Sequence, residues 1–584
     1  MPFDGIALNA IIKELKECLV GGRIEKIYQP GKTEILLCIR QHKEERMLFI
    51  SAHPQNCRLH LTTREKENPK TPPAFCMLLR KNISGGKIAD IRQRDLERLV
   101  EIAVENEDEF GRPVMRSLVV EIMGKHSNII LIDNSTKTII DSIKRIPSEI
   151  NRVREILPGK KYVLPPLGER INILEDEVPN FILQAAEPLK VGRWMTENLM
   201  GMSKAAAKEI LFRSGVDEDK PVNQLNLEER QKIAGSLVKL ASDIKGSRYL
   251  PEIYFSHGPV EEPVDFWIFP LSHMGPSKAV PLKSANEAVD LFYSLKEDLE
   301  KLRNLKKTLM AQLENQISKL RQILSFQQEK LDEVRDMEKF KLFGELLSAY
   351  LYEVSPGMSE IELPNFYEDG KMVSIPLKEN LSPSQNAQYY FEKYKKLRAT
   401  REKVENQREK ILSEIQYLES ELYNIEQAEN LEELEEIQKE LSKYGYIKEA
   451  GKKSKGEVQP SSPIKYTSST GFTILVGKNN VQNDMITRKA NPDDIWIHVK
   501  DLPGSHVIIK TGGRPVDEET LLEGCLCAAY HSKARNSSNV AVDYTLRKHV
   551  RKPPGAKPGF VIYDHHRTVY VTPDPAFIER LKKN

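Results

Sequence analysis

The strongest pattern along the chain is a heptad repeat of apolar residues in two stretches, about residues 286–336 and 386–440. In both stretches, apolar side chains recur at spacings of three and four, which places them along one face of a helix. The first set is Leu302, Leu305, Leu309, Leu313, Ile317, Leu320, Leu324, Leu331 and Val334. The second set is Tyr394, Leu397, Val404, Ile411, Ile415, Leu418, Leu422 and Ile425. Apolar a and d positions over several heptads are typical of a coiled coil.

The segment between the two arms cannot be one continuous helix. Residues 337–385 contain Gly344, Pro364 and Pro376, and a proline removes a helical hydrogen bond and clashes with the preceding turn. Two arms of similar length around a small head predict an antiparallel coiled-coil hairpin over residues 285–445. Each arm of about 45 residues would span about 65 Å. The alternative is an independent dimeric coiled coil, which the matched arm lengths disfavour.

Shorter apolar runs with turn signals between them fill the first part of the chain. Runs at 35–40 and 118–123 are rich in β-branched and aliphatic residues, so residues 1–170 are predicted to form a β-rich domain with a few helices. Residues 171–284 change to short helices with polar loops and then return to strand-like runs, which predicts a small helical domain with a strand-rich return.

The last part of the chain combines strand-like and helical patterns. Residues 446–463 form a polar stretch typical of a flexible linker. Within 464–584, runs at 472–476 and 495–499 predict strands and 518–534 predicts a helix, so this part is expected to be a compact α+β domain. The whole chain is therefore predicted to be an α+β multidomain protein.

Composition excludes several classes of protein. Over 584 residues, 87 Lys and Arg nearly balance 85 Asp and Glu, which excludes a globally basic protein. No apolar run approaches the roughly 18 residues of a membrane span, and the beginning of the chain lacks the features of a signal peptide. Six cysteines are too few for a disulfide framework, and Cys525 and Cys527 have no second Cys or His pair at zinc spacing. We expect a cytoplasmic protein with no membrane partner, metal or cofactor.

Positive charge nevertheless concentrates in the last domain. Residues 464–584 hold 18 Lys and Arg against 12 Asp and Glu. Prolines and glycines in the densest run, 547–559, forbid a helix and hold its cations on an extended loop, which could follow a phosphate backbone of structured RNA. The predicted RNA-binding residues are His498, Lys500, His506, Arg547, Lys548, Arg551, Lys552 and Lys557. A solvated basic loop is the alternative interpretation.

Catalytic patterns are weak. His498 and His506 with Asp494 and Ser505 could be interpreted as a catalytic group, but the sequence has no nucleophile elbow and no third histidine at metal-ligand spacing. Glycine-rich phosphate-binding motifs are absent. Pro2 could act as an amine nucleophile of a DNA glycosylase, but such enzymes carry Glu directly after Pro, and here Phe3 follows. The sequence predicts no catalytic residues.

Four blocks together resemble the NFACT family. They are Phe3-Asp4-Gly5 with 22–30, then 75–81, 121–131 and 494–507. The resemblance runs the whole chain in the same domain order. It implies an NFACT-N domain at 1–170, a helix-hairpin-helix-like domain at 171–284, coiled-coil arms with a head at 285–445, and an NFACT-R RNA-binding domain at 464–584.

The resemblance also implies a function and partners. The family acts in ribosome quality control: it binds large ribosomal subunits obstructed by peptidyl-tRNA, contacts rRNA and recruits charged tRNA. Bacterial members direct untemplated alanine tails that mark the stalled chain for degradation, so alanine tRNA and a small accessory RNA-binding protein are expected partners. The ribosome itself would make the peptide bonds, so this chain would not be an enzyme. A fibronectin-binding surface adhesin is the alternative, and the missing signal peptide and anchor motif argue against it.

The resemblance finally assigns candidate tRNA-binding residues. An Asp-Arg pair that the family requires for tRNA recruitment matches Glu97-Arg98, where Glu replaces Asp and the guanidinium is kept. Glu121, Ile122 and Met123 match a family patch near the tRNA anticodon arm. For this second group, the alternative is an ordinary strand in which Ile122 belongs to the core.

Overall fold

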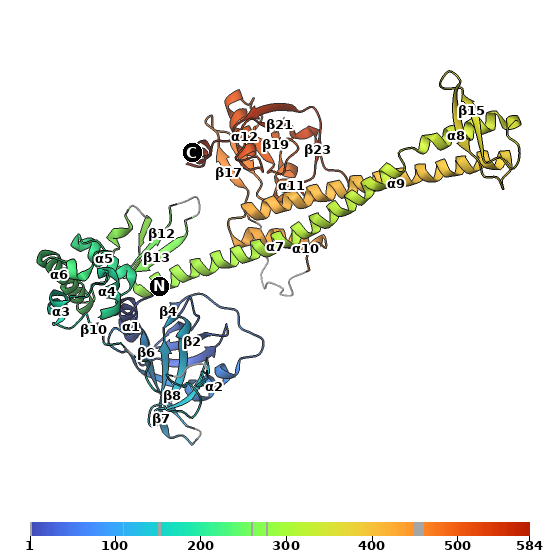
Figure 1. The fold of residues 1–584 in the computed structure, drawn as a ribbon. Coiled ribbons are helices and arrows are strands. Elements are labelled where there is room, and N and C mark those ends of the chain that lie inside the picture. Colours follow the sequence, from blue (N-terminus) through green and yellow to red (C-terminus); the bar gives the residue numbers. More distant parts are fainter. Residues whose placement is uncertain are drawn as a thin grey trace. The chain divides into compact units, whose positions relative to one another are not determined.

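The computed structural model describes residues 3–108, 110–149, 153–166, 168–257, 261–275, 278–448 and 461–583. These residues divide into two compact units, Met1–Asp298 and Leu299–Asn584 (Figure 1). The predicted class is an α+β multidomain protein, and its coarse architecture, a mixed α/β multidomain protein, is confirmed: the first unit holds a large antiparallel sheet, and a long helical segment follows. Pro2 and most of the predicted linker, 449–460, lie outside the described residues.

A nine-stranded antiparallel sheet forms the larger part of the first unit, in the order β4-β3-β2-β1-β5-β6-β7-β8-β9. Its strands are β1 (Arg23–Tyr28), β2 (Glu34–Gln41), β3 (Glu44–Ser51), β4 (Arg58–Thr62), β5 (Lys87–Gln93), β6 (Leu99–Glu107), β7 (Pro113–Glu121), β8 (Asn128–Asp133) and β9 (Thr138–Ser142). The two halves of the sheet are meanders in chain order. They join where Arg23 of β1 faces Lys87 of β5.

Helix α1 (Gly5–Leu19) packs against this sheet, and α2 (Ala74–Ile83) leads from β4 to β5. The Asp4 side chain caps α1 by accepting a hydrogen bond from the Ala7 backbone N–H at 2.7 Å. The first turns of α1 are buried on nearly every side, at Ile6, Leu8 and Ile11 among others. A helix that is apolar all round needs partners on more than one face, and here the sheet supplies one of them.

The rest of the first unit consists of short helices and small sheets. The helices are α3 (Val178–Gln184), α4 (Val191–Asn198), α5 (Lys204–Ser214) and α6 (Leu227–Lys245). The strands are β10 (Ile171–Asn172), paired with β11 (Leu199–Met200), and β12 (Glu252–Phe255), paired with β13 (Pro263–Trp267) and β14 (Lys278–Pro281). Trp194 and Trp267 are buried in the same core as the face of the large sheet, so these elements and the sheet fold together.

The division between the two units falls inside one long helix, α7 (Ala285–Glu333), because its first turns are anchored to the N-terminal sheet. Glu14 of α1 accepts hydrogen bonds from the backbone N–H groups of Ala285 and Asn286, at 2.7 and 3.0 Å. Farther along, Glu297 forms ion pairs with Arg58 and with Lys66. These contacts anchor the first turns of α7 within the first unit.

In the second unit, the rest of α7 pairs with α9 (Pro383–Gln427) in antiparallel orientation. Leu309, Leu313 and Leu418 are buried in their shared seam, and Arg321 forms an ion pair with Glu419 at 2.6 Å. The inserted head contains α8 (Met337–Ala349), β15 (Glu360–Asn365) and β16 (Lys371–Pro376) around a small core of its own.

The second arm ends earlier than the bound of about 440 predicted from the heptads. Helix α9 stops at Gln427, and α10 (Leu431–Lys443) begins after a short break, where Asn430 accepts a hydrogen bond from the Glu433 N–H at 3.0 Å. Leu434 and Leu441 of α10 are buried in the same seam, although they lie outside the heptad frame of α9, whose last apolar position is Ile425. The heptads therefore predict the burial along α9 but not the packing of α10.

The C-terminal domain is built on a six-stranded sheet in the order β17-β18-β20-β19-β21-β24. Its strands are β17 (Ile464–Thr467), β18 (Thr473–Val476), β19 (Ile495–Val499), β20 (Val507–Lys510), β21 (Val540–Leu546) and β24 (Arg567–Val571). The remaining elements are α11 (Asn480–Lys489), α12 (Glu518–Tyr530), α13 (Pro575–Lys583) and the pair β22 (Val550–Arg551) and β23 (Ile562–Tyr563). No described helix combines the length and apolar character needed to cross a membrane.

Two buried carboxyl groups meet in the second unit, where α9, α10 and α11 pack together. Glu421 is fully buried and Glu440 nearly so. Asn480 donates a hydrogen bond to Glu421 Oε1 at 2.8 Å, and the Tyr417 hydroxyl donates to Glu440 Oε1 at 2.9 Å. Burial raises the pKa of both carboxyls, and the charge on Glu440 raises the pKa of Glu421 further. The pair therefore retains a proton in the folded protein.

This proton makes the stability of the second unit depend on pH. A carboxyl with a higher pKa in the folded chain keeps its proton while the unfolded chain loses it, so stability falls as pH rises above about 4.3. Glu421→Gln keeps a donor toward Glu440 and an acceptor for Asn480 but has no proton to lose. We expect this variant to unfold at a higher temperature than the wild type near pH 8, and at a similar temperature near pH 4.

Thermal unfolding followed by circular dichroism across this pH range checks the prediction. Glu409→Gln, at an exposed position on the same helix, serves as the matched control and should leave the pH profile unchanged. Equal unfolding temperatures for Glu421→Gln and the wild type at high pH would contradict the buried shared proton.

Candidate functional site

A pocket of about 340 Å³ opens in the first unit where three segments meet. These segments are the beginning of α1, the turn between β5 and β6, and the turn from α4 to α5. Its lining residues are Asp4, Gly5, Leu96, Glu97, Arg98, Arg170, Thr196, Gly201, Met202, Ser203 and Lys204. The pocket thus contains both members of the predicted Glu97-Arg98 pair, together with the Asp4-Gly5 motif from the beginning of the chain.

The three segments approach one another closely because two of them carry glycine at the contact. A Cβ on Gly5 would lie 1.8 Å from the Leu96 carbonyl oxygen and 2.8 Å from the Gly201 Cα. Gly201 has a φ of +79°, and a Cβ there would lie 2.9 Å from the Leu96 Cβ. Any other side chain at either position would force the segments apart, so these glycines determine where Arg98 lies.

The two acidic groups of the pocket are occupied by protein partners. Asp4 is buried, caps α1 and accepts a hydrogen bond from Trp267 Nε1 at 3.1 Å. Burial raises the pKa of Asp4 to about 6, although hydrogen bonds and the nearby Arg98 charge oppose this shift. Glu97 is also buried and accepts a hydrogen bond from Arg170 Nη2 at 2.7 Å. Both carboxylates therefore point into the protein.

The cations of the pocket are more accessible than its acids. Arg98 and Arg170 are half-buried and Lys204 is exposed. Guanidinium groups suit phosphate because their planar donors can bind two oxygens at once. The pocket can therefore bind an anion at its mouth, while Glu97 holds Arg170 in place. Arg170 and Lys204 were missed at the sequence level because the fold alone brings them beside Arg98.

The second group of predicted tRNA-binding residues lies mostly inside the protein. The Glu121 side chain is fully buried, accepts a hydrogen bond from the Tyr162 hydroxyl at 2.8 Å and forms an ion pair with Arg154. Ile122 is fully buried as well, and its backbone N–H donates to the Arg98 carbonyl at 2.9 Å. In this structure, a nucleic acid cannot reach the side chains of Glu121 and Ile122, which instead support the strand next to Arg98.

Exposed cations follow directly after this buried stretch. Met123 is half-buried, and Lys125 and His126 in the short turn Gly124–His126 are exposed. These two residues belong to the same sequence block as Glu121. The block therefore contains exposed residues that could contact tRNA, but hydrophobic periodicity alone does not separate them from the buried residues.

In the C-terminal domain, four of the eight predicted RNA-binding residues interact mainly within the protein. His506 is buried, its Nδ1 lies 2.9 Å from the Thr487 hydroxyl, and burial lowers the pKa of its imidazole to about 3. Arg547 donates to the backbone carbonyls of Thr487 and Val550. His498 Nε2 lies 3.3 Å from the Gly504 carbonyl oxygen, and burial lowers its pKa.

Lys557 is the fourth of these residues, and it binds the helical arm. Its ammonium lies 4.6 Å from the centre of the Tyr417 ring and 4.5 Å from that of Tyr446, and burial lowers its pKa. An ammonium between two aromatic faces makes cation–π contacts. In this structure, Lys557 therefore fixes the basic loop to the arm.

The other four predicted residues face solvent. Lys500, Lys548, Arg551 and Lys552 are all exposed, although Lys552 forms an ion pair with Asp484. Beside them in sequence, Arg567 and Tyr570 of β24 are exposed too, and they add a cation and an aromatic ring on which a base could stack. These exposed groups are the part of the domain that can contact an RNA backbone.

Comparison with known proteins identifies both halves of the chain. Residues 4–459 match the model of the NFACT N-terminal and middle domains, and residues 463–564 match the NFACT protein RNA binding domain. The protein named Rqc2 homolog RqcH from Bacillus subtilis (strain 168) is 37% identical over 100% of both chains, and that from Streptococcus suis (strain 05ZYH33) is 36% identical over 100% of both. The human ribosome quality control complex subunit NEMF is 22% identical over 60% of this chain and 33% of its own length.

The close approach at the pocket leads to a stability prediction. Gly5→Ala places a methyl group against the Leu96 carbonyl, so the segments must separate, at a cost of about 1–3 kcal/mol. We expect a lower midpoint of thermal unfolding, measured by scanning calorimetry. The matched control is Gly235→Ala in α6, where an added Cβ meets nothing within 4 Å and should raise helix stability by up to about 1 kcal/mol. If Gly5→Ala unfolds like the wild type, the glycine contact does not hold the pocket together.

Proposed function

The chain belongs to the NFACT family and is homologous to the ribosome quality control factors RqcH and NEMF, and on this premise we propose its function. It binds large ribosomal subunits that are obstructed by peptidyl-tRNA and recruits charged tRNA to them. It directs the untemplated addition of alanine to the carboxy terminus of the stalled chain, which marks that chain for degradation. The observation that carries the proposal is identity of 37% to RqcH over the full length of both chains.

The pocket around Arg98 supports a role in holding tRNA. Its two guanidinium groups and the Lys204 ammonium can bind phosphate oxygens, whereas its two carboxylates are held inside the protein. A volume of about 340 Å³ admits a phosphate or a single nucleotide but no base-paired helix. Lys125, in the turn that follows β7, adds an exposed cation, and His126 beside it adds an exposed imidazole that can hydrogen-bond to RNA. We assign tRNA binding to this combined surface, with Arg98 at its centre.

The C-terminal domain supports a second contact with RNA. Its exposed Lys548 and Arg551 flank the beginning of the proline- and glycine-containing loop, and Arg567 begins β24. Each phosphate that such a cation neutralises releases counterions, so this binding is sensitive to salt. Two RNA-binding regions in one chain gain affinity from their linkage, because binding of the first raises the local concentration of the second.

The chemistry of tailing belongs to the ribosome in this proposal. The chain positions tRNA, and the peptidyl transferase centre forms each peptide bond, with alanine tRNA as the substrate and a small accessory RNA-binding protein as a further partner. The surroundings of His498 and His506 favour a structural role for both residues over a catalytic one. The pKa of His506 is about 3, so it is a weak base, and its Nδ1 is already bonded to Thr487.

Substitution of Arg98 tests the tRNA assignment. Arg98→Ala removes a charged hydrogen-bond donor, and such bonds contribute about 1.5–3 kcal/mol, so tRNA affinity should fall by at least roughly tenfold. The measurement is the amount of tRNA that co-purifies with the chain from cells, with binding to purified tRNA as a second readout. Arg92→Ala, at an exposed position on β5, is the matched control and should retain tRNA. Undiminished tRNA in Arg98→Ala would remove Arg98 from the site.

Charge reversal in the C-terminal domain tests the second contact. Lys548→Glu with Arg551→Glu should weaken association with large ribosomal subunits in sedimentation assays. The variant should also bind with a weaker dependence on salt. In a plot of the logarithm of the affinity against the logarithm of the salt concentration, the slope should become less steep by about 0.7–0.9 for each phosphate that the variant no longer neutralises. The matched control, Arg580→Glu with Lys582→Glu on α13, also reverses one exposed arginine and one exposed lysine and should have little effect. An unchanged salt dependence in the double variant would exclude phosphate binding by these residues.

A further inference from the structure

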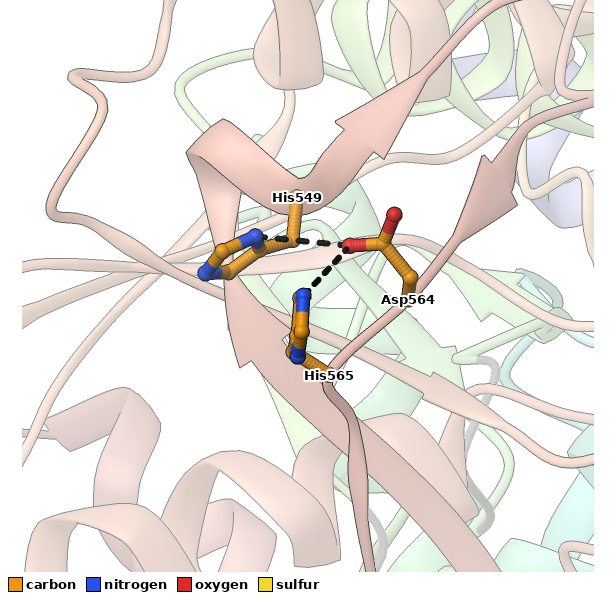
Figure 2. A group of neighbouring side chains, drawn as sticks. All are labelled: His549, Asp564 and His565. Carbon is orange, nitrogen blue, oxygen red and sulfur yellow. Dashed lines mark ion pairs between the residues drawn. The ribbon is translucent and has the colours of Figure 1, made fainter.

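Three potential metal ligands meet at the base of the basic loop. They are His549, the last residue of the short turn Arg547–His549, and Asp564 and His565, which directly follow β23. Figure 2 shows both imidazoles directed toward the same carboxylate oxygen. Among the residues that the structure describes, this is the one group in which three His, Cys, Asp or Glu side chains could ligate an ion together.

The distances are close to those of a coordination sphere. His549 Nδ1 lies 3.3 Å and His565 Nε2 lies 3.9 Å from Asp564 Oδ1, and the candidate ligand atoms all lie within 4.8 Å of one another. Bonds of about 2.0–2.1 Å to a tetrahedral zinc ion put two ligands about 3.3 Å apart. The pair His549 and Asp564 already has this spacing. The largely exposed His565 side chain needs only a small rotation to reach it.

The backbone holds the two segments in place independently of any ion. The strands β22 and β23 pair Val550 with Tyr563, and the Asp564 N–H then donates to the His549 carbonyl at 3.3 Å. His565 has a φ of +50°, a left-handed conformation that is uncommon for residues other than glycine. The Thr545 hydroxyl, which lies 3.0 Å from the Asp564 carbonyl oxygen, helps to fix this turn. The unusual backbone at His565 brings its side chain beside His549.

The two imidazole rings also lie close to each other. The ring centroids of His549 and His565 are 4.7 Å apart. Two imidazole nitrogens and one carboxylate oxygen gathered in this way can share one divalent cation.

We propose that His549, Asp564 and His565 bind one divalent transition-metal ion of the zinc class. Two imidazole nitrogens and one carboxylate oxygen are ligands that zinc accepts, and they leave the fourth position to water or to an oxygen of a bound phosphate. The ion ties the two ends of the loop 550–563 to each other. This site escapes detection in the sequence because His549 and the pair Asp564-His565 do not have the short spacings of zinc-binding motifs. The proposal does not depend on the proposed ribosomal role.

The thiols of the chain are poor competitors for the same ion in the folded protein. Cys525 and Cys527 are fully buried in α12, and burial raises the pKa of Cys525 to about 12. A thiol must lose its proton to bind zinc, and a raised pKa opposes this loss. Co²⁺ as a spectroscopic probe distinguishes an ion bound by imidazole and carboxylate ligands from an ion bound by cysteines. Thiolate ligands produce intense charge-transfer bands, and imidazole and carboxylate ligands lack them.

Metal binding by the full-length, tag-free chain tests the proposal. After treatment with a chelator and its removal, Zn²⁺ is titrated calorimetrically into the wild type, into the double variant His549→Ala with His565→Ala, and into Asp564→Asn. The wild type should bind one Zn²⁺ per chain, and each variant should bind it at least roughly tenfold more weakly. Co²⁺ should produce visible bands without thiolate charge transfer. Lower pH should weaken binding, because protonated imidazoles cannot ligate a metal.

The neighbouring residue provides the matched control. His566 is exposed and stands outside the cluster, so His566→Ala should bind Zn²⁺ as the wild type does. Far-UV circular dichroism establishes that each variant is folded before its affinity is compared. Absence of Zn²⁺ binding by the wild type would overturn the site. Equal binding by the wild type, the double variant and Asp564→Asn would overturn it too.

Discussion

The candidate tRNA site depends on the contacts that Asp4 and Gly5 make at the beginning of α1. Asp4 caps the helix and binds Trp267, so one carboxylate ties the first helix to the strands that follow the helical elements. Gly5 then allows the Leu96 carbonyl and the Gly201 turn to come closer than any side chain would permit. These contacts bring the β5–β6 turn, which carries Glu97 and Arg98, to the α4–α5 turn. The accessibility of Arg98 is thus a consequence of packing around one buried aspartate and two glycines.

Charge in this protein is divided between groups that hold the fold together and groups that face outward. Glu121 and Glu97 are buried and bound to specific donors, because a carboxylate away from water needs partners. Lys557 likewise binds two tyrosine rings. The cations left at the surface include Lys548 and Arg551. A near-neutral total charge is therefore compatible with an RNA-binding protein, since some of its acids are internal and positive charge concentrates in the last domain.

Hydrophobic periodicity predicted the long helices, and it predicted that both sheet domains consist of strands with a few helices. It could do so because the burial of a whole helix or strand face repeats over many residues. It did not predict α10 as a separate helix: the second arm was expected to reach about residue 440, whereas α9 ends at Gln427 and α10 buries Leu434 and Leu441 from a separate apolar frame. Nor could local pattern show that Glu121 is buried: its partners, Tyr162 and Arg154, come from a later segment. The cluster of His549, Asp564 and His565 likewise exists only after β22 and β23 have paired. Arg98 was identified by family resemblance, whereas its neighbours Arg170 and Lys204 required the structure.

We propose that this chain brings a specific charged tRNA to an obstructed large ribosomal subunit. Purifying the chain from cells and sequencing the RNA bound to it, with a mock purification as the reference, tests this proposal most directly. We expect enrichment of alanine tRNA over other tRNAs, together with large-subunit rRNA and without a matching amount of small-subunit rRNA. RNA whose composition equals that of the mock purification would contradict it.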